Sequence, residues 1–93
     1  MGTGDEKRMK QFTYVITDEI GIHARPAGLL AKEAKQFQST VMLACNGKSA
    51  AANKLMAVMG MGVKQGNSVE VSIEGPDEDA AYEAMEKFFQ ENL

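Results

Sequence analysis

The string GIHARPAG, Gly21–Gly28, contains the only histidine of this 93-residue chain, and Arg25 and Pro26 follow it closely. With one histidine and one cysteine, the chain offers few side chains for nucleophilic or metal chemistry. A lone histidine in a small protein more often has no chemical role, so the neighbouring residues must supply the argument for one. Three local features favour a role for His23.

The first feature is the position of His23. Apolar residues recur at helical spacing after it, which predicts a helix that begins near Ala24 and ends near Phe37. The first backbone N–H groups of a helix have no intrahelical acceptors, and the helix dipole is positive there. We therefore expect the imidazole to lie where an anion is favoured. The predicted buried stripe contains Ala27, Leu30, Ala31, Ala34 and Phe37.

Arg25 and Pro26 are the second and third features. A cation in the first helical turn costs about 0.3–1 kcal/mol, which indicates a compensating anion. A guanidinium matches the oxygens of a phosphate well, although a nearby carboxylate is the alternative partner. Pro26 stiffens a first turn, and a helix-starting role explains it equally. Gly21 lets the backbone enter the turn without a Cβ clash.

Other site chemistries lack their residues. A zinc site needs about four ligands, which His23 and Cys45 do not supply. The phase of Cys45 with Val41 and Leu43 directs its thiol into the core, away from a Cys–His nucleophile pair. There is no Walker-type phosphate loop. A histidine that carries an anion, most economically a phosphoryl group, is the remaining chemistry, and we expect no metal and no cofactor.

The elements that position this site follow from hydrophobic periodicity and turn signals. Alternating apolar residues predict strands, and Asn46–Gly47 is a strong hairpin signal. Asp77 is the expected N-cap of the last helix. The predicted strands are 10–17, 40–46, 48–51 and 68–74, and helices are expected at 24–37, at 55–61 and after Asp77. The order β-α-β-β-α-β-α fits an α+β fold, with helices on one face of an antiparallel sheet.

Composition limits the class of protein. Residues 1–8 read as a flexible lead, which leaves one domain over residues 9–93. There is no apolar run long enough to span a membrane and no signal peptide, so we expect a cytoplasmic protein. The net charge of −3 argues against a nucleic acid partner, and an RNA-binding module would need a basic patch and stacking aromatic residues.

The string GIHARPAG closely resembles the phosphorylation-site motif of HPr, the histidine-containing phosphocarrier family of the bacterial phosphoenolpyruvate:sugar phosphotransferase system. The resemblance runs from Met9 to the end of the chain. It includes NGKSA at Asn46–Ala50, the short-helix stretch KLMAVMGMG and the strand GNSVEVSIEG. It implies an open-faced β-sandwich, in which three helices cover one face of a four-stranded antiparallel sheet.

The resemblance also implies a role for each site residue. His23 would accept a phosphoryl group on Nδ1 from phosphorylated enzyme I and pass it to the IIA domains of sugar permeases. Arg25 would contact the phosphoryl oxygens, and Ala24 would donate a backbone N–H to them. The chain would then be a carrier of phosphoryl groups rather than an enzyme.

A carrier needs a surface on which its partners dock, and we expect it beside His23. Gly28 and Leu29 lie off the buried helical stripe, and Lys32 follows one turn later. Exposed methionines suit a surface that binds several unlike partners, and core filling is their alternative role. We expect the docking role for Leu55, Met56 and Met59 and the core role for Val58 and Met61.

One position departs from the family pattern. The regulatory serine that some members carry just before the short helix is replaced here by Lys54, which cannot accept a phosphate. Lys54 argues against regulation by a serine kinase at this position and leaves other serine phosphorylation open, and Asn53 is available to cap the short helix. The alternative function is a regulatory binding module with an HPr-like fold, which has no need of an exposed histidine. A small acidic carrier that exchanges partners is most simply a monomer.

Overall fold

The computed structural model describes residues 10–93. The predicted lead over residues 1–8 lies outside them. Over the described part of the chain, the strands and helices follow the predicted order β-α-β-β-α-β-α. The strands are β1 (Lys10–Val15), β2 (Thr40–Cys45), β3 (Lys48–Ala51) and β4 (Ser68–Glu74), and the helices are α1 (Ala24–Ala34), α2 (Leu55–Gly60) and α3 (Glu78–Asn92).

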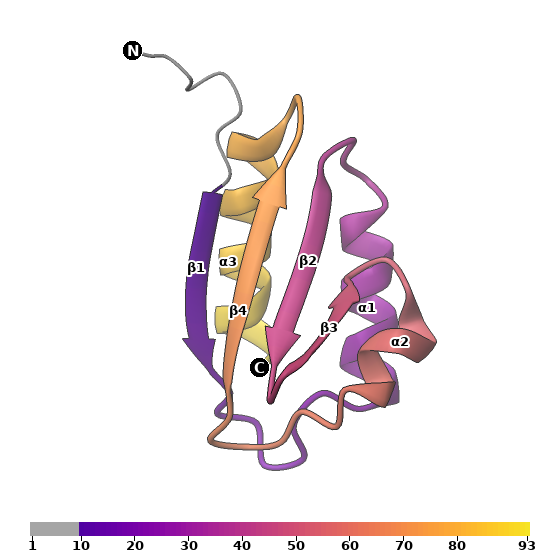
Figure 1. Ribbon diagram of the computed structural model, residues 1–93, viewed down its shortest axis with the longest axis vertical. Helices are drawn as coiled ribbons and strands as arrows, with labels where there is room; N and C mark the ends of the chain where they lie inside the picture. The colour runs from indigo at the N-terminus through magenta and orange to yellow at the C-terminus, as the bar shows by residue number, and fades with distance from the viewer. Residues whose placement is uncertain (1–9) are drawn as a thin grey trace.

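The strands form one antiparallel sheet in the order β1-β4-β2-β3. Helices α1 and α3 lie side by side behind this sheet, and α2 lies beside α1 and β3 (Figure 1). None of the elements described over residues 10–93 covers the other face of the sheet. The predicted α+β open-faced sandwich is therefore confirmed.

The core lies between the sheet and the helices, and it follows the predicted periodicities. Alternate residues of β2 and β4 are fully or almost fully buried, as are the apolar stripes of α1 and α3. Phe89 of α3 packs edge to face against Phe12 and Tyr14 of β1, with ring centroids 5.8 and 5.6 Å apart. Burial of each large apolar side chain contributes roughly 1.5–3 kcal/mol, which holds the helices on the sheet.

Several element ends differ from the predicted bounds by a few residues. Strand β1 ends at Val15. The Ile16 N–H still donates to the Asn67 carbonyl at 3.0 Å, but the Asn67 N–H donates to the Lys64 carbonyl at 3.0 Å and does not return the bond. Helix α1 ends at Ala34 rather than near Phe37. Its last turn tightens into i→i+3 hydrogen bonds, and the Phe37 N–H donates to the Ala34 carbonyl at 3.2 Å.

The predicted hairpin between β2 and β3 is confirmed. Asn46 and Gly47 have φ values of 55° and 77°, the left-handed pair that a two-residue hairpin turn requires. The turn pairs Cys45 with Lys48 and directs Cys45 into the core. It also fixes where β3 leads into α2.

Asp77 occupies the predicted N-cap position of α3, but its side chain does not cap the helix. Its carboxylate accepts hydrogen bonds from the backbone N–H groups of Gln38 and Ser39, both at 2.9 Å, and from the Ser39 hydroxyl. The carboxylate therefore joins the loop between α1 and β2 to the loop between β4 and α3.

Candidate functional site

His23 is the N-cap residue of α1 and has an extended backbone, with φ −114° and ψ −169°. Its carbonyl accepts the first intrahelical hydrogen bond, from the Ala27 N–H at 2.9 Å. The imidazole is half-buried and makes no capping hydrogen bond. The helix end therefore holds the backbone of His23 while its ring nitrogens stay available.

Two backbone donors of the first turn of α1 lie next to this ring. The Ala24 and Arg25 N–H groups have no acceptor among residues 10–93. Pro26 has no N–H, and the Ala27 N–H already bonds to His23. The helix end thus offers an anion two unpaired amides and the positive end of the dipole.

Arg25 lies in the first turn of α1, is exposed, and has no acidic residue in that turn with it. Within the described part of the chain, the ion pair found joins Lys10 to Asp79 at 3.0 Å and does not involve Arg25. The alternative in which Arg25 pairs with a carboxylate is therefore not what the structure favours. Among residues 10–93 the guanidinium thus has no ion-pair partner, and it lines the same depression as the His23 imidazole.

The loop before His23 is held in place by hydrogen bonds within the loop and by Val63. The Ile20 N–H donates to the Asp18 carboxylate at 2.8 Å, and the Gly21 N–H donates to the Asp18 carbonyl at 3.1 Å. The Ile22 N–H donates to the Val63 carbonyl at 3.2 Å. Ile22 itself is buried in the core. The residue before His23 is thus anchored, which fixes where the imidazole starts.

The end of α3 forms a further wall of the site. The Leu93 main-chain oxygen accepts hydrogen bonds from the Thr17 N–H at 2.6 Å, the Thr17 hydroxyl at 2.9 Å and the Asp18 N–H at 2.9 Å. These contacts hold the last turn of α3 against the loop that leads to His23. An open depression results, lined by Asp18, His23, Arg25, Pro26, Leu29, Glu91 and Asn92.

Sequence reasoning missed the part of this depression that comes from α3. The Asp18 turn has a local signal in the string DEIG, but nothing local in the sequence of α3 links Glu91 or Asn92 to His23. Their proximity depends on the contact of Leu93 with Thr17, which joins residues 76 positions apart.

Exposed apolar side chains gather on α1 and α2, which contact each other. We call Leu29, Leu55, Met56 and Met59 the apolar patch, with exposed fractions of 43%, 39%, 75% and 36%. Val58 and Met61 are buried, as expected for core residues. Gly28 is half-buried and Lys32 is exposed, which agrees with their predicted place off the buried stripe. Ile20, exposed by 66% in the loop before His23, is a further apolar side chain that the sequence reasoning missed.

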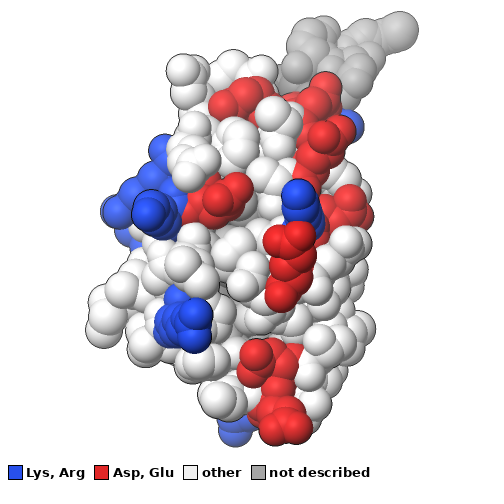
Figure 2. Space-filling model, turned by 180° about the vertical axis from the view of Figure 1, so that it is seen from behind, with Lys and Arg blue, Asp and Glu red and all other residues white. Residues whose placement is uncertain are grey.

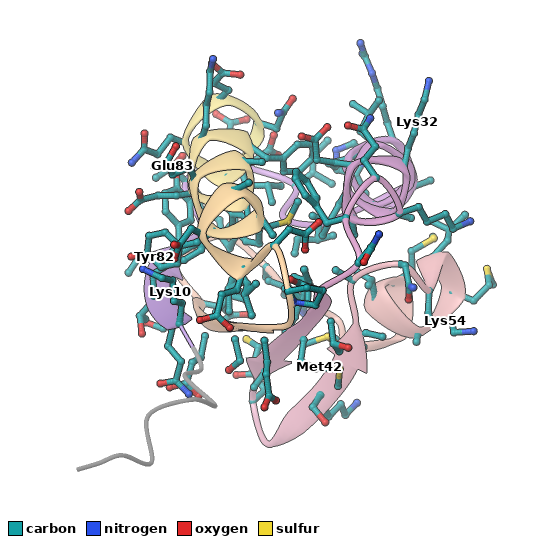
Figure 3. All side chains as sticks on the ribbon, turned by 90° about the horizontal axis from the view of Figure 1, so that it is seen from above. Lys10, Lys32, Met42, Lys54, Tyr82 and Glu83 are labelled. Carbon is teal, nitrogen blue, oxygen red and sulfur yellow. The ribbon has the colours of Figure 1, made fainter. Side chains whose placement is uncertain are left out.

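Lys54 is the N-cap residue of α2, so the expectation that Asn53 caps this helix is wrong. No side chain caps α2, whose first intrahelical bond runs from the Val58 N–H to the Lys54 carbonyl at 3.0 Å. The Lys54 side chain points away from the sheet, as does that of Lys32 (Figure 3). A cation therefore stands at the position where the resemblance to HPr places the regulatory serine of some members.

Charge is unevenly distributed on the helical side of the molecule. Figure 2 shows blue side chains on the side of α1 and α2 and a band of red ones along α3. The cations of the first group include Arg25, Lys32 and Lys54, and the acidic residues of α3 include Glu83 and Glu91. The depression beside His23 lies where these two regions meet.

The described residues offer little for other chemistries. No group of three or more metal-ligating side chains occurs among residues 10–93. Cys45 is buried, and this burial raises the pKa of its thiol, which disfavours a reactive thiolate. No helix in the described part of the chain is long and apolar enough to cross a membrane.

Comparison with known proteins gives a consistent answer. Residues 10–91 match the family described as "PTS HPr component phosphorylation site". The phosphocarrier protein HPr of Mycoplasma capricolum is 39% identical over 79 residues, which cover 85% of this chain and 89% of that protein. The solved Mycoplasma histidine-containing phosphocarrier has a TM-score of 0.83 at 38% identity, covering 85% and 90% of the two chains. HPr from Thermoanaerobacter tengcongensis gives 0.82 at 37% identity, covering 87% and 91%.

The family match spans nearly all of the described residues and includes the helix end that carries His23. The relatives are similar to this chain in sequence, and the solved structure is also similar in fold. The chain therefore belongs to the HPr family, the phosphocarrier proteins of the bacterial phosphotransferase system that serves sugar transport.

Proposed function

We propose that His23 is the residue that carries the phosphoryl group. It accepts the group on Nδ1 from phosphorylated enzyme I and delivers it to the IIA domains of sugar permeases. The observation that carries this assignment is the available imidazole of His23 at the N-terminus of α1, beside an unpaired Arg25 guanidinium. Of the described residues, no other histidine competes for the role.

The proposed step is an exchange of one phosphorus bond for another. The lone pair of Nδ1 forms the new P–N bond while the bond between phosphorus and the donor breaks, so the phosphoryl group moves without oxidation or reduction. Transfer of this kind depends on positioning and on stabilisation of charge. Arg25 supplies a cation for the phosphoryl oxygens, and the Ala24 N–H supplies a neutral donor from the helix end.

The open setting of the site suits a carrier. A carrier must release its cargo, and the depression beside His23 offers few donors rather than an enclosing cradle. In the complex, the partner would exclude water and strengthen each of these interactions. The apolar patch, with Gly28 and Lys32 beside it, is the proposed contact surface for enzyme I and IIA.

The proposal places the protein in the cytoplasm as a monomer without a cofactor. All the residues assigned to the phosphoryl group come from one chain, so a second copy is not needed to complete the site. Because Lys54 replaces the regulatory serine, we also propose that a serine kinase does not act at this position.

The decisive experiment incubates the protein with phosphoenolpyruvate and catalytic enzyme I and follows its intact mass. We expect the gain of one phosphoryl group that is labile in acid and stable in base, and no gain in His23→Ala. Because the imidazole makes no capping hydrogen bond, this variant should keep the fold, which circular dichroism checks. An unmodified wild-type protein in the presence of an active donor would refute the assignment. Retained partner binding without phosphorylation would favour the alternative, a regulatory docking module.

A further inference from the structure

We propose that the negative charge of Glu91, together with that of Asp18, makes the phosphorylated form of His23 less stable. The inference rests on the proposed phosphorylation of His23. Glu91 lines the same depression as His23 and Arg25 but comes from the opposite helix, α3. The depression therefore contains both the cation expected to attract the phosphoryl group and carboxylates expected to repel it.

The place of Glu91 is fixed by the end of its helix. The Leu93 main-chain oxygen accepts three hydrogen bonds from Thr17 and Asp18, which lie in the loop before His23. Glu91 is two residues earlier in the same turn, so this contact holds its backbone beside the depression. Asp18 is likewise held in place, because its carboxylate accepts the Ile20 N–H at 2.8 Å.

Neither carboxylate forms an ion pair within the described part of the chain. The ion pair found there joins Lys10 at the start of β1 to Asp79 in the first turn of α3, whereas Glu91 lies in the last turn of that helix. A phosphoryl group on His23 would add about −1.5 to −2 charges at neutral pH, next to these negative charges. The repulsion disfavours the phosphorylated form, while Arg25 and the helix end favour it.

The expected size of the effect follows from Coulomb's law in a solvent-exposed setting. Glu91 is exposed, so the effective dielectric is close to that of water and the interaction is modest. Removing its charge should raise the equilibrium constant for phosphorylation of His23 by about two- to fivefold at low salt. A balance of this kind keeps the phosphoryl group transferable to a second protein.

The test compares equilibrium constants rather than rates. Wild type, Glu91→Gln and Glu83→Gln are equilibrated with phosphoenolpyruvate, pyruvate and catalytic enzyme I, and the phosphorylated fraction is read by intact mass. The end states alone set this constant, so a change in docking to enzyme I cannot alter it. Glu83 is the matched control, because it is exposed on the same helix, does not line the depression and points outward (Figure 3).

We expect Glu91→Gln to shift the equilibrium by about two- to fivefold at an ionic strength of about 0.01 M and hardly at all at about 1 M, where the Debye length is about 3 Å. Glu91→Asp should restore most of the wild-type value, and Glu83→Gln should match wild type. An unchanged constant in Glu91→Gln, or a change that salt does not remove, would overturn the inference. A wild-type protein that takes up no phosphoryl group would instead overturn the proposed function.

Discussion

Gly21 rests directly on the carbonyl of Val63. A Cβ atom on Gly21 would lie 2.3 Å from that oxygen, and the Gly21 backbone has a φ of +86°. The same oxygen accepts the hydrogen bond from the Ile22 N–H at 3.2 Å. The close approach of two backbones therefore determines where the chain enters the turn at His23, and it needs a residue without a side chain.

We predict that Gly21→Ala is destabilising and displaces His23. The left-handed backbone costs an alanine about 1–2 kcal/mol, and the contact with Val63 adds a steric cost. Gly66→Ala is the matched control, because Gly66 has a φ of +88° but nothing within 4 Å of the added Cβ. Urea denaturation should show a larger loss of unfolding free energy for Gly21→Ala. Equal losses in the two variants would mean that the loop moves away from Val63 without cost.

Arg25 gives a prediction in which transfer and stability change independently. Its charge opposes the dipole at the start of α1, and it forms no ion pair in the described part of the chain. Arg25→Ala should therefore leave the free energy of unfolding unchanged or raise it by about 0.3–1 kcal/mol. Phosphoryl transfer should slow by about 10²–10³-fold, as expected when a group that stabilises developing charge is removed.

The control for Arg25 lies at the other end of the same helix. Lys35 is the exposed C-cap residue of α1, where a cation is favourable. Lys35→Ala should lower stability slightly and leave transfer near the wild-type rate. Stopped-flow transfer from phosphorylated enzyme I and urea denaturation measure the two properties separately. If Arg25→Ala lost folding and transfer together, Arg25 would be a structural residue.

The parts of the fold that were predictable are those with a local physical cause. The switch from alternation in β1 to helical spacing after Ala24 reflects which side chains face one shared core. The Asn46–Gly47 turn needs left-handed backbone at both positions, which few other residue pairs supply so readily. His23 and Arg25 were predictable as a pair, because one helix end positions both of them.

The remaining features depend on packing between distant segments. Glu91 reaches the site because Leu93 accepts hydrogen bonds from Thr17, and no spacing within α3 encodes that contact. Asp77 was predicted from its residue type as a helix cap. Its carboxylate instead bonds to Gln38 and Ser39, because the loop between α1 and β2 brings unpaired donors to it. The residue type indicated an acceptor of backbone N–H groups, and only the fold determines which groups these are.

The hydrogen bonds to the Asp77 carboxylate predict that the free energy of unfolding depends on pH. The Ser39 hydroxyl, and then the Gln38 N–H, hold the pKa of Asp77 below its usual value of 3.8. A carboxyl with a pKa that is lower in the folded state stabilises the protein above the unfolded-state pKa. That stabilisation is lost as the pH falls through the folded-state value. Asp77→Asn should therefore be less stable than wild type at pH 7, and the difference should shrink as the pH falls below about 4.

Urea midpoints of wild type and Asp77→Asn, measured from pH 7 down to about pH 2.5, would test this dependence. Glu83→Gln removes a carboxylate from an exposed position on the same helix and should show no such narrowing. A gap between wild type and Asp77→Asn that stayed constant with pH would show that the charge of Asp77 does not contribute.

The apolar patch gives a prediction in which affinity for a partner falls while the stability of the fold does not. Met56 is 75% exposed and lies in the first turn of α2, so Met56→Glu removes apolar surface without opening the core. A carboxylate there also suits the helix dipole, so stability should stay the same or rise slightly. Affinity for enzyme I should fall by about 10-fold or more, since a partner that buries Met56 gains roughly 1.5–3 kcal/mol from it.

Two further variants separate the causes of that loss of affinity. Met56→Gln keeps the length of the side chain without a charge, so it should fall between wild type and Met56→Glu. Thr13→Glu adds the same charge at an exposed position on β1, on another element, and should bind as wild type does. Isothermal titration with unphosphorylated enzyme I measures all of them without transfer chemistry. Wild-type affinity in Met56→Glu would remove Met56 from the docking surface, whereas an equal loss in Thr13→Glu would indicate a general effect of charge.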